Sequence, residues 1–373
     1  MAKPRCKQTT LNSFYGNFLY EQKVSREHFL KKLHEVIDWD RFTKRLLQYY
    51  KGKGELGQAP YNPSMVLKML LLSYLYNISE RQVEVLANDS LSVACFLGLG
   101  ADEEAPDHST LSLFKDRLLE NGRGKAYEDL LDEIIRIAKE KGVKFGKLQL
   151  LDTVHVVADV NLEKDKARQK GGGEPRDKDA TWGVKGEKIV MSKDGRREKK
   201  TDYFYGYKDQ VSLNAEAEMI TSVKTGYGDE YDGRWLPYLV ERDLKKGIEV
   251  GTVAADRGYD DGENHYYLEQ KGVNSAIRLK GLRTQKKDPN KESWIKLKES
   301  KEYQQGLRER YKIERKFGEM KKWHGFGRCR YLGLAKHSIQ LFLTSIAVNL
   351  KRIVKLLTGI GFRGEAKSYL KAG

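Results

Sequence analysis

The chain has 373 residues, 39% of them hydrophobic, and its 69 lysines and arginines against 53 aspartates and glutamates give a net charge of +16. It is long enough to bury a sizeable core, and its basic surface favours a polyphosphate partner because cation–phosphate contacts release condensed counterions. An anionic membrane surface is the alternative partner, but no apolar run approaches the ~20 residues of a spanning helix. The three cysteines are isolated in sequence, which gives no support for a disulfide framework or a structural zinc site. We expect a cytoplasmic protein with no membrane partner.

The first part of the chain has helical periodicity. Apolar residues recur at three- and four-residue spacing in the segments 25–36, 40–50, 63–76, 79–88, 89–98 and 109–120. Helix-start signals agree, since Asn62 precedes Pro63 and Ser79 is followed by Gln82 in capping-box spacing. We predict an all-α domain over residues 1–121. Its short helices could bind DNA or mediate dimerisation, or they could simply bury one another.

The chain then changes character. A charged helix over 122–146 is expected to connect the helical domain to an α/β domain over 147–356, and residues 357–373 form a basic tail. Strand-like runs lie at 147–158, 204–214, 218–225 and 250–256, and helical runs at 234–246, 262–271, 303–322 and 334–356. The predicted fold class is therefore mixed α+β.

A long basic segment separates the first two predicted strands. Residues 163–203 are rich in glycine, lysine and arginine and poor in aliphatic side chains, so we expect a mobile loop. The loop could be a solvated surface excursion. It could also order against nucleic acid, with Trp182 and nearby tyrosines available for stacking.

Three carboxylates stand at positions that suit chemistry. Asp152 interrupts the apolar run LQLLDTVHVVADV, and a buried charge needs a partner. Asp256 follows a short apolar strand, at the edge where open α/β sheets expose ligand-binding groups. Glu314 shares a predicted helix face with Arg310 and Lys321, which suits either a phosphate and metal site or an ordinary salt-bridged surface.

The order strand, strand, helix, with separations of 104 and 58 residues, resembles the Asp-Asp-Glu triad of DDE-class insertion-sequence transposases. The motifs LDTVHV, ADRGYD and R-x3-E-x6-K followed by WHGFGRCRYLG are similar to those around the three acids in that family. YNPSMVLKMLLLSYLYNISERQVEVLAN looks like the helical domain that precedes the catalytic core. The resemblance runs from about residue 15 to residue 355 and implies an RNase H-like catalytic domain over 147–356.

The resemblance also implies a reaction. A DNA transposase of this class binds the ends of an insertion sequence, cleaves phosphodiester bonds and joins the freed 3′-hydroxyls to target DNA. Two Mg²⁺ ions, for which Mn²⁺ could substitute, are expected on Asp152, Asp256 and Glu314, with Asp152 bridging both. The expected partners are double-stranded DNA, as terminal inverted repeats and as target, and a second copy of the chain in the paired-end complex. The expected location is a prokaryotic cytoplasm, in association with the nucleoid.

Further residues are expected to contact DNA because they are basic or aromatic and lie near the acids in the sequence motifs. They are Arg310, Lys321, Lys185, Lys208, Arg257, Lys280, Arg283, Trp323 and His324. Strand alternation should turn His155 away from Asp152, so a structural or DNA-contact role is expected for it.

One position departs from the family pattern. Leu307 stands where related transposases have a tyrosine, with Tyr303 and Tyr311 one turn to either side. Two other functions stay compatible with the sequence. One is a catalytically silent relative that only binds DNA, and the other is an RNase H-fold nuclease that hydrolyses DNA without joining it.

Overall fold

The computed structural model describes residues 6, 14–50, 59–100, 102–122, 124–191, 197–285 and 288–362, apart from the side chains of residues 14–17, 187 and 188. The chain divides into two compact units, one made of residues 1–143 and 343–373 and the other of residues 144–342. Within the described ranges, none of the helices combines the length and apolar character needed to cross a membrane.

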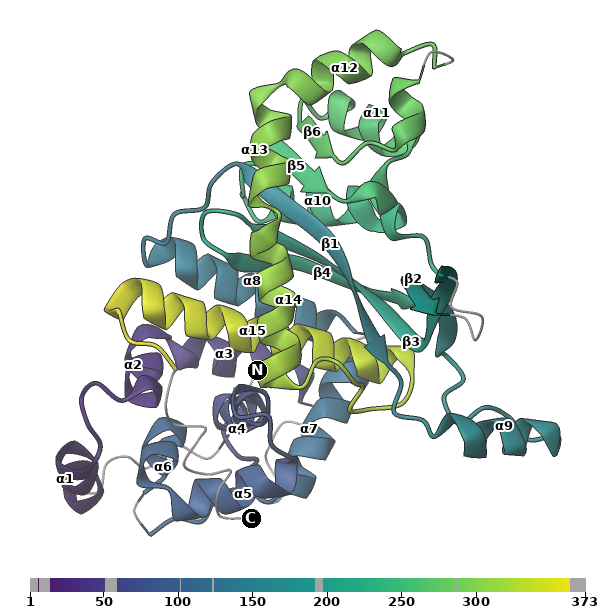
Figure 1. Cartoon of the computed structure of the whole chain (residues 1–373). Helices are drawn as coiled ribbons and strands as arrows, with labels where there is room; N and C mark the ends of the chain where they lie inside the picture. Colours follow the sequence, from purple (N-terminus) through teal and green to yellow (C-terminus); the bar gives the residue numbers. More distant parts are fainter. Residues whose placement is uncertain are drawn as a thin grey trace. The chain divides into compact units, whose positions relative to one another are not determined.

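The first unit is built from helices (Figure 1). They are α1 (Phe14–Lys23), α2 (Phe29–Val36), α3 (Trp39–Leu46), the 3-10 turn η1 (Leu47–Tyr49), α4 (Pro63–Leu75), α5 (Glu80–Asp89), α6 (Leu91–Leu97), α7 (His108–Asn121) and α8 (Lys125–Glu140). The last helix, α15 (Leu334–Thr358), begins in the second unit and ends in the first. The prediction of a helical N-terminal region is confirmed.

Helix α4 forms the centre of this unit, since every one of its residues is buried. Its start is fixed by Asn62, whose side chain accepts a hydrogen bond from the Ser64 amide at 2.9 Å, and by Pro63 in the first turn. Ser79 and Gln82 form the predicted capping box at the start of α5. Local signals therefore set the helix starts, and burial of α4 holds the helices together.

The second unit contains a six-stranded mixed sheet. Its strands are β1 (Leu148–Val157), β2 (Thr181–Met191), β3 (Arg197–Asn214), β4 (Met219–Tyr227), β5 (Thr252–Ala255) and β6 (Asn274–Ile277). They are ordered β2-β3-β1-β5-β6, and β4 also pairs with β3. β1 is antiparallel to β3 and parallel to β5, and β5 is parallel to β6. The mixed α+β class is confirmed.

Helical elements connect and cover these strands. They are α9 (Leu162–Lys170), η2 (Asp232–Trp235), α10 (Leu236–Lys245), η3 (Arg257–Tyr259), α11 (Gly262–Gln270), η4 (Gly281–Thr284), α12 (Lys291–Glu299), α13 (Lys301–Glu309) and α14 (Tyr311–His324). Leu236, Leu239 and Leu268 of α10 and α11 belong to one buried cluster with Val253 of β5. This cluster anchors the strand that leads to Asp256.

Helix α13 lies very close to the sheet. A β-carbon at Gly306 would lie 2.5 Å from the Ala276 β-carbon and 3.0 Å from that of Ala254, so only glycine permits this approach to β5 and β6. α14 continues from α13 along β1 (Figure 1). Close packing of α13 thus sets the path of the helix that carries Glu314.

The segment predicted as a mobile basic loop is structured, so that prediction is wrong. Residues 163–203 contain most of α9 and a hairpin made by β2 and the start of β3, with residues 192–196 outside the described part. The two strands of the hairpin pair with each other, but side chains on both faces are exposed. Its composition is therefore typical of a loop although its backbone is extended.

The helix predicted over 303–322 also differs from expectation. It is divided at Arg310, between α13 and α14, although Arg310 keeps helical dihedral angles (φ −56°, ψ −27°). Strand β6 and helix α12 were not predicted, because four residues of β6 and a lysine-rich α12 leave little periodicity to detect.

Candidate active site

Asp152 lies in the middle of β1, the strand between β3 and β5, and its side chain is only 16% exposed. One carboxylate oxygen lies 3.1 Å from Arg310 Nη2, and the other accepts a hydrogen bond from the Thr153 amide at 2.8 Å. Burial raises the pKa of Asp152 to about 6, against the opposing effects of Arg310 and the Thr153 amide. The negative charges of Asp256 and Glu314 raise this pKa further.

Asp256 follows β5 directly and begins the turn η3 by accepting a hydrogen bond from the Gly258 amide at 2.7 Å. The turn is tight against a fourth carboxylate. A β-carbon at Gly258 would lie 2.9 Å from Asp232 Oδ2 and 3.0 Å from Asp256 Oδ1. Asp232 Oδ1 in turn lies 3.0 Å from Lys208 Nζ. The sequence motifs did not single out Asp232.

Glu314 lies in the first turn of α14 and is exposed. Among the residues with described positions, no three histidine, cysteine or acidic side chains are spaced to hold a metal ion. The Arg310 guanidinium instead provides the positive charge beside Asp152. The oxygen donors suit Mg²⁺ or Mn²⁺, but coordination by all three acids would require Arg310 to leave Asp152 and the Glu314 side chain to turn inward.

A buried tyrosine joins the two aspartate-bearing elements. The Tyr259 hydroxyl lies 2.9 Å from Thr153 Oγ1, and it also donates a hydrogen bond to Gln210. Burial raises the pKa of Tyr259, and the charge of Asp152 raises it further. Tyr259 therefore fixes the turn after Asp256 against the strand position that follows Asp152. The ADRGYD motif contains this residue, but nothing in the motif predicts a role for its hydroxyl.

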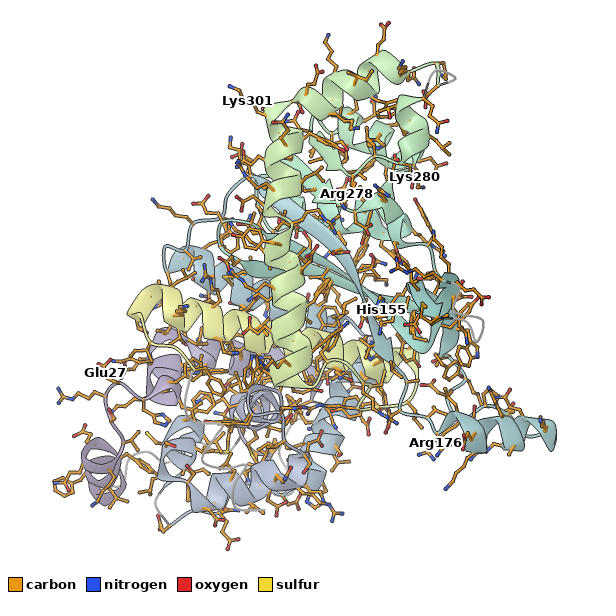
Figure 2. All side chains as sticks on the ribbon, in the orientation of Figure 1. Glu27, His155, Arg176, Arg278, Lys280 and Lys301 are labelled. Atoms are coloured by element: carbon orange, nitrogen blue, oxygen red, sulfur yellow. The ribbon has the colours of Figure 1, made fainter. Side chains whose placement is uncertain are left out.

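Three of the predicted DNA-contact lysines affect the pKa of His155. This histidine lies on β1 (Figure 2). The centre of its ring is 5.1 Å from that of the Phe204 ring. Burial lowers the pKa of His155 to about 4, and Lys321, Lys185 and Lys208 lower it further. The lowered pKa keeps the ring neutral at pH 7, and the three lysines belong to α14, β2 and β3.

The strand register places His155 opposite Lys208 and Asp152 opposite Val211. Because side chains alternate along a strand, positions 152 and 155 face opposite sides of the sheet. His155 is therefore not grouped with the three acids.

The remaining predicted DNA-contact residues differ in their surroundings. Lys280, labelled in Figure 2, donates a hydrogen bond from Nζ to the Asp260 carbonyl at 2.9 Å. Arg283 Nε lies 3.3 Å from Asp260 Oδ1, and its guanidinium lies 4.9 Å from the Trp294 ring centre. Arg257 is exposed. Lys280 and Arg283 are thus held by contacts within the unit.

The last two residues of α14, Trp323 and His324, differ in exposure. Trp323 is 54% exposed, whereas His324 is fully buried and lies 4.0 Å from Glu319. The expected DNA contact of His324 does not fit its position, because the residue closes the buried side of α14. The alternation of one exposed and one buried residue follows from the helix itself.

Leu307 stands where related transposases have a tyrosine, and the two tyrosines one turn to either side of it lie in different environments. Tyr303 is buried, and its hydroxyl accepts a hydrogen bond from the Leu279 amide at 3.2 Å. Tyr311 is 52% exposed, with the Arg315 guanidinium 5.8 Å from its ring centre. Of the two, only Tyr311 presents its ring to solvent.

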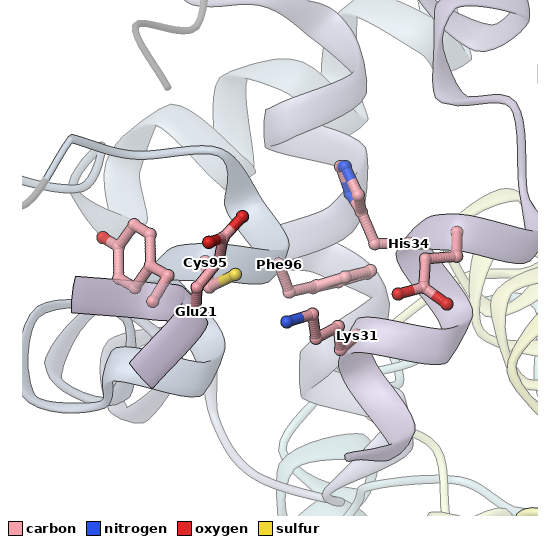
Figure 3. A pocket seen from close by; sticks show the side chains of 7 residues that line it. Glu21, Lys31, His34, Cys95 and Phe96 are labelled. Carbon is pink, nitrogen blue, oxygen red and sulfur yellow. The ribbon is translucent and has the colours of Figure 1, made fainter. Parts of the chain in front are cut away.

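A separate cavity lies in the helical unit (Figure 3). It has a volume of about 190 Å³ and is lined by Tyr20, Glu21, Lys31, His34, Glu35, Cys95 and Phe96. Burial lowers the pKa of the neighbouring Lys68 to about 7, and Lys68 Nζ donates to the Phe96 carbonyl at 2.8 Å. None of the three acids lies in this cavity.

Comparison with known proteins gives two family matches. A family described as a transposase domain (DUF772) matches residues 18–117, and one described as a transposase DDE domain matches residues 170–350. Among solved structures, a cryo-EM structure of a piggyBac transposase synaptic complex with hairpin DNA is similar. That match has 10% sequence identity, covers 98% of this chain and 80% of that chain, and has a TM-score of 0.41. On its two transposase family matches, the chain belongs to the DDE-class transposases.

Proposed function

We propose that the protein is a cut-and-paste DNA transposase whose catalytic residues are Asp152, Asp256 and Glu314. The observation that carries the proposal is the state of Asp152, a carboxylate buried on a central strand with its pKa raised by burial and by the other two acids. Such a group is costly for the fold unless a cation compensates its charge. The family match to a transposase DDE domain supports the reaction.

The three carboxylates are proposed to hold two divalent cations, Mg²⁺ or Mn²⁺. When bound, such cations activate a water or hydroxyl for attack and neutralise charge at the phosphorus. Asp152 on its strand and Asp256 on its capped turn provide fixed oxygens, and Glu314 completes the set from α14. Arg310 would exchange its contact with Asp152 for a DNA phosphate, to which guanidinium can donate two hydrogen bonds.

The protein's own residues would then act in two steps. The DNA end is placed so that a water attacks the phosphodiester bond and frees a 3′-hydroxyl, and this hydroxyl next attacks a phosphate of the target. Lys185, Lys208 and Lys321 are proposed to bind DNA phosphates around His155. Arg257 and Trp323 are exposed and suited to the same role, while Lys280 and Arg283 would contribute from a loop that Asp260 holds.

We further propose that two copies of the chain act together, because two element ends must be joined to one target. Sedimentation of the protein with paired ends should give two copies per complex. A single copy on paired ends would overturn this part of the proposal.

The Arg310–Asp152 ion pair is the one observation that favours a second candidate, a silent relative that binds DNA without cutting it. Incubation with element ends and Mg²⁺ or Mn²⁺ separates the two. A transposase nicks the ends and transfers pre-cleaved 3′-ends to a target plasmid. A hydrolytic nuclease only nicks, and a silent relative does neither.

A further inference from the structure

The hairpin of β2 and β3 extends beyond the sheet as a two-stranded ribbon. The pairing of β1 with β3 ends at the Val157–Gly206 pair, and that of β4 with β3 ends at Tyr207. From Tyr205 outward to Arg197, β3 pairs with β2 alone among the described strands. We call residues 182–191 and 197–205 the ribbon. Such two-stranded ribbons are marginally stable on their own in water, so a partner would stabilise it.

One face of the ribbon gathers large exposed side chains. Five cross-strand pairs lie on the same face, because alternate residues of β3 share a face and the register shift between Val184 and Gly186 absorbs one residue of β2: they are Met191–Arg197, Ile189–Lys199, Glu187–Thr201, Val184–Tyr203 and Trp182–Tyr205. Exposure reaches 66% for Met191, 69% for Ile189, 54% for Val184, 59% for Tyr203 and 48% for Trp182. These side chains form two exposed apolar groups, separated by the polar pair Glu187–Thr201, and exposed apolar surface of this kind marks an interaction site.

The charges on that face indicate which partner it fits. Arg197 and Lys199 are exposed and stand opposite Met191 and Ile189, so each outer pair presents one aliphatic group and one cation. A second copy of a chain with a net charge of +16 would bring like charges together, whereas DNA supplies phosphates. The nine residues of β3 in the ribbon span roughly 30 Å, close to one turn of a duplex, and the major groove admits a two-stranded β-ribbon.

We propose that this face of the ribbon binds duplex DNA, with Arg197 and Lys199 on phosphates and the apolar side chains against the groove. The proposal rests on the proposed function and extends it, since it places a stretch of duplex on an element that carries none of the three acids. Trp182, which has Lys166 at 5.9 Å from its ring centre, lies at the inner end of this face.

The test measures binding of the full-length protein to a fluorescent duplex of about 40 base pairs across a salt series. The double variant R197A/K199A should lower the slope of log affinity against log salt by about 2, because two phosphate contacts are lost. The double variant I189S/M191S should weaken binding about tenfold while keeping the wild-type slope. Tyr266→Ser, which removes an aromatic ring that is 63% exposed on α11, is the control and should leave binding unchanged.

A second readout reports on the ribbon directly. Duplex should change the tryptophan emission of the wild type, and Trp182→Phe should reduce that change, while circular dichroism checks that each variant is folded. Ribbon variants that bind with wild-type affinity and slope would overturn the proposal. So would I189S/M191S variants that lose self-association in sedimentation while keeping DNA affinity. Metal-dependent nicking at saturating DNA tests the proposed function separately, because the ribbon variants should retain it.

Discussion

Two buried aspartates in the same unit differ in how their charges are compensated. Asp260 is 1% exposed and accepts hydrogen bonds from the Lys280 amide at 2.6 Å and from His265, with Arg283 beside it. Burial alone would raise the pKa of Asp260, but these partners hold it below its usual value. Among the described residues, Asp152 has hydrogen bonds from Arg310 and one backbone amide, and burial raises its pKa to about 6.

We propose that this difference separates a structural carboxylate, Asp260, from a catalytic one, Asp152. The two carboxylate oxygens of Asp260 form hydrogen bonds with the Lys280 amide and with His265 of α11, so the charge of Asp260 stabilises the fold. Because burial raises the pKa of Asp152 to about 6, its ionised form costs folding free energy at neutral pH, and in our proposal a bound cation would offset that cost. The predictions below test this contrast between the two sites.

The largest expected effect concerns cleavage. Asp152→Ala, Asp256→Ala and Glu314→Ala should each reduce nicking of element ends by roughly 1,000-fold or more, since essential groups that act as a unit are not replaced by the others. DNA affinity should stay within a few-fold of wild type, because the basic surface remains. Asp260→Ala is unsuitable as a control, since its loss disturbs the loop. Glu163→Ala, on the exposed side of α9, serves instead and should cleave normally.

A smaller loss of activity is expected at Arg310. Arg310→Lys keeps the positive charge but loses the planar donor fork, so cleavage should fall about 10- to 100-fold at pH 7. The measurement is the nicking rate as a function of pH. Loss of the guanidinium should also raise the pKa of Asp152 further, which shifts the acid limb of the pH–rate profile to higher pH. An unchanged profile would mean that Arg310 does not act on Asp152.

The next effect is on stability without metal. Between about pH 4 and pH 6 the folded protein binds more protons at Asp152 than the unfolded chain does, so the free energy of unfolding falls as pH rises through that window. In EDTA at pH 7, Asp152→Asn should therefore raise the free energy of unfolding by about 2–3 kcal/mol. Below about pH 4 the variant and the wild type should melt alike.

Asp260→Asn should act in the opposite direction. It weakens the interactions of this side chain with His265 and Arg283, and we expect the free energy of unfolding to fall by about 1–2 kcal/mol at pH 7 in the same melting experiment. The depressed pKa means that the stabilisation by Asp260 is present above its unfolded pKa and is lost as pH falls through its lower folded value. If both asparagine variants destabilise at pH 7, the contrast between the two sites is wrong.

Much of the fold could be read from the sequence where local signals are strong. The capping box at Ser79 and the Asn62–Pro63 helix start are local and were found in the structure. The ribbon was missed because both of its faces are exposed, which removes the apolar alternation that identifies most strands. The break between α13 and α14 was not predicted, because Arg310, which lies between them, keeps helical dihedral angles.

The site could be predicted only in part, for a different reason. Acids at strand ends and in a helix motif can be seen in a sequence, but their neighbours across the sheet cannot. Asp232 comes close to Asp256 only because Gly258 leaves room for it, and Tyr259 reaches Thr153 from over 100 positions away. Arg310 was expected to position phosphate, yet its contact in this structure is Asp152. Pairings of this kind depend on tertiary packing, not on local pattern.

The most direct measurement is the anomalous diffraction of Mn²⁺ in crystals of the protein bound to an element end. We predict Mn²⁺ peaks within coordinating distance of Asp152, Asp256 and Glu314 in a single pocket, with Arg310 moved from Asp152 to a DNA phosphate. Peaks that lie elsewhere, or a Glu314 side chain that contacts no metal while Arg310 stays on Asp152, would contradict the proposed active site.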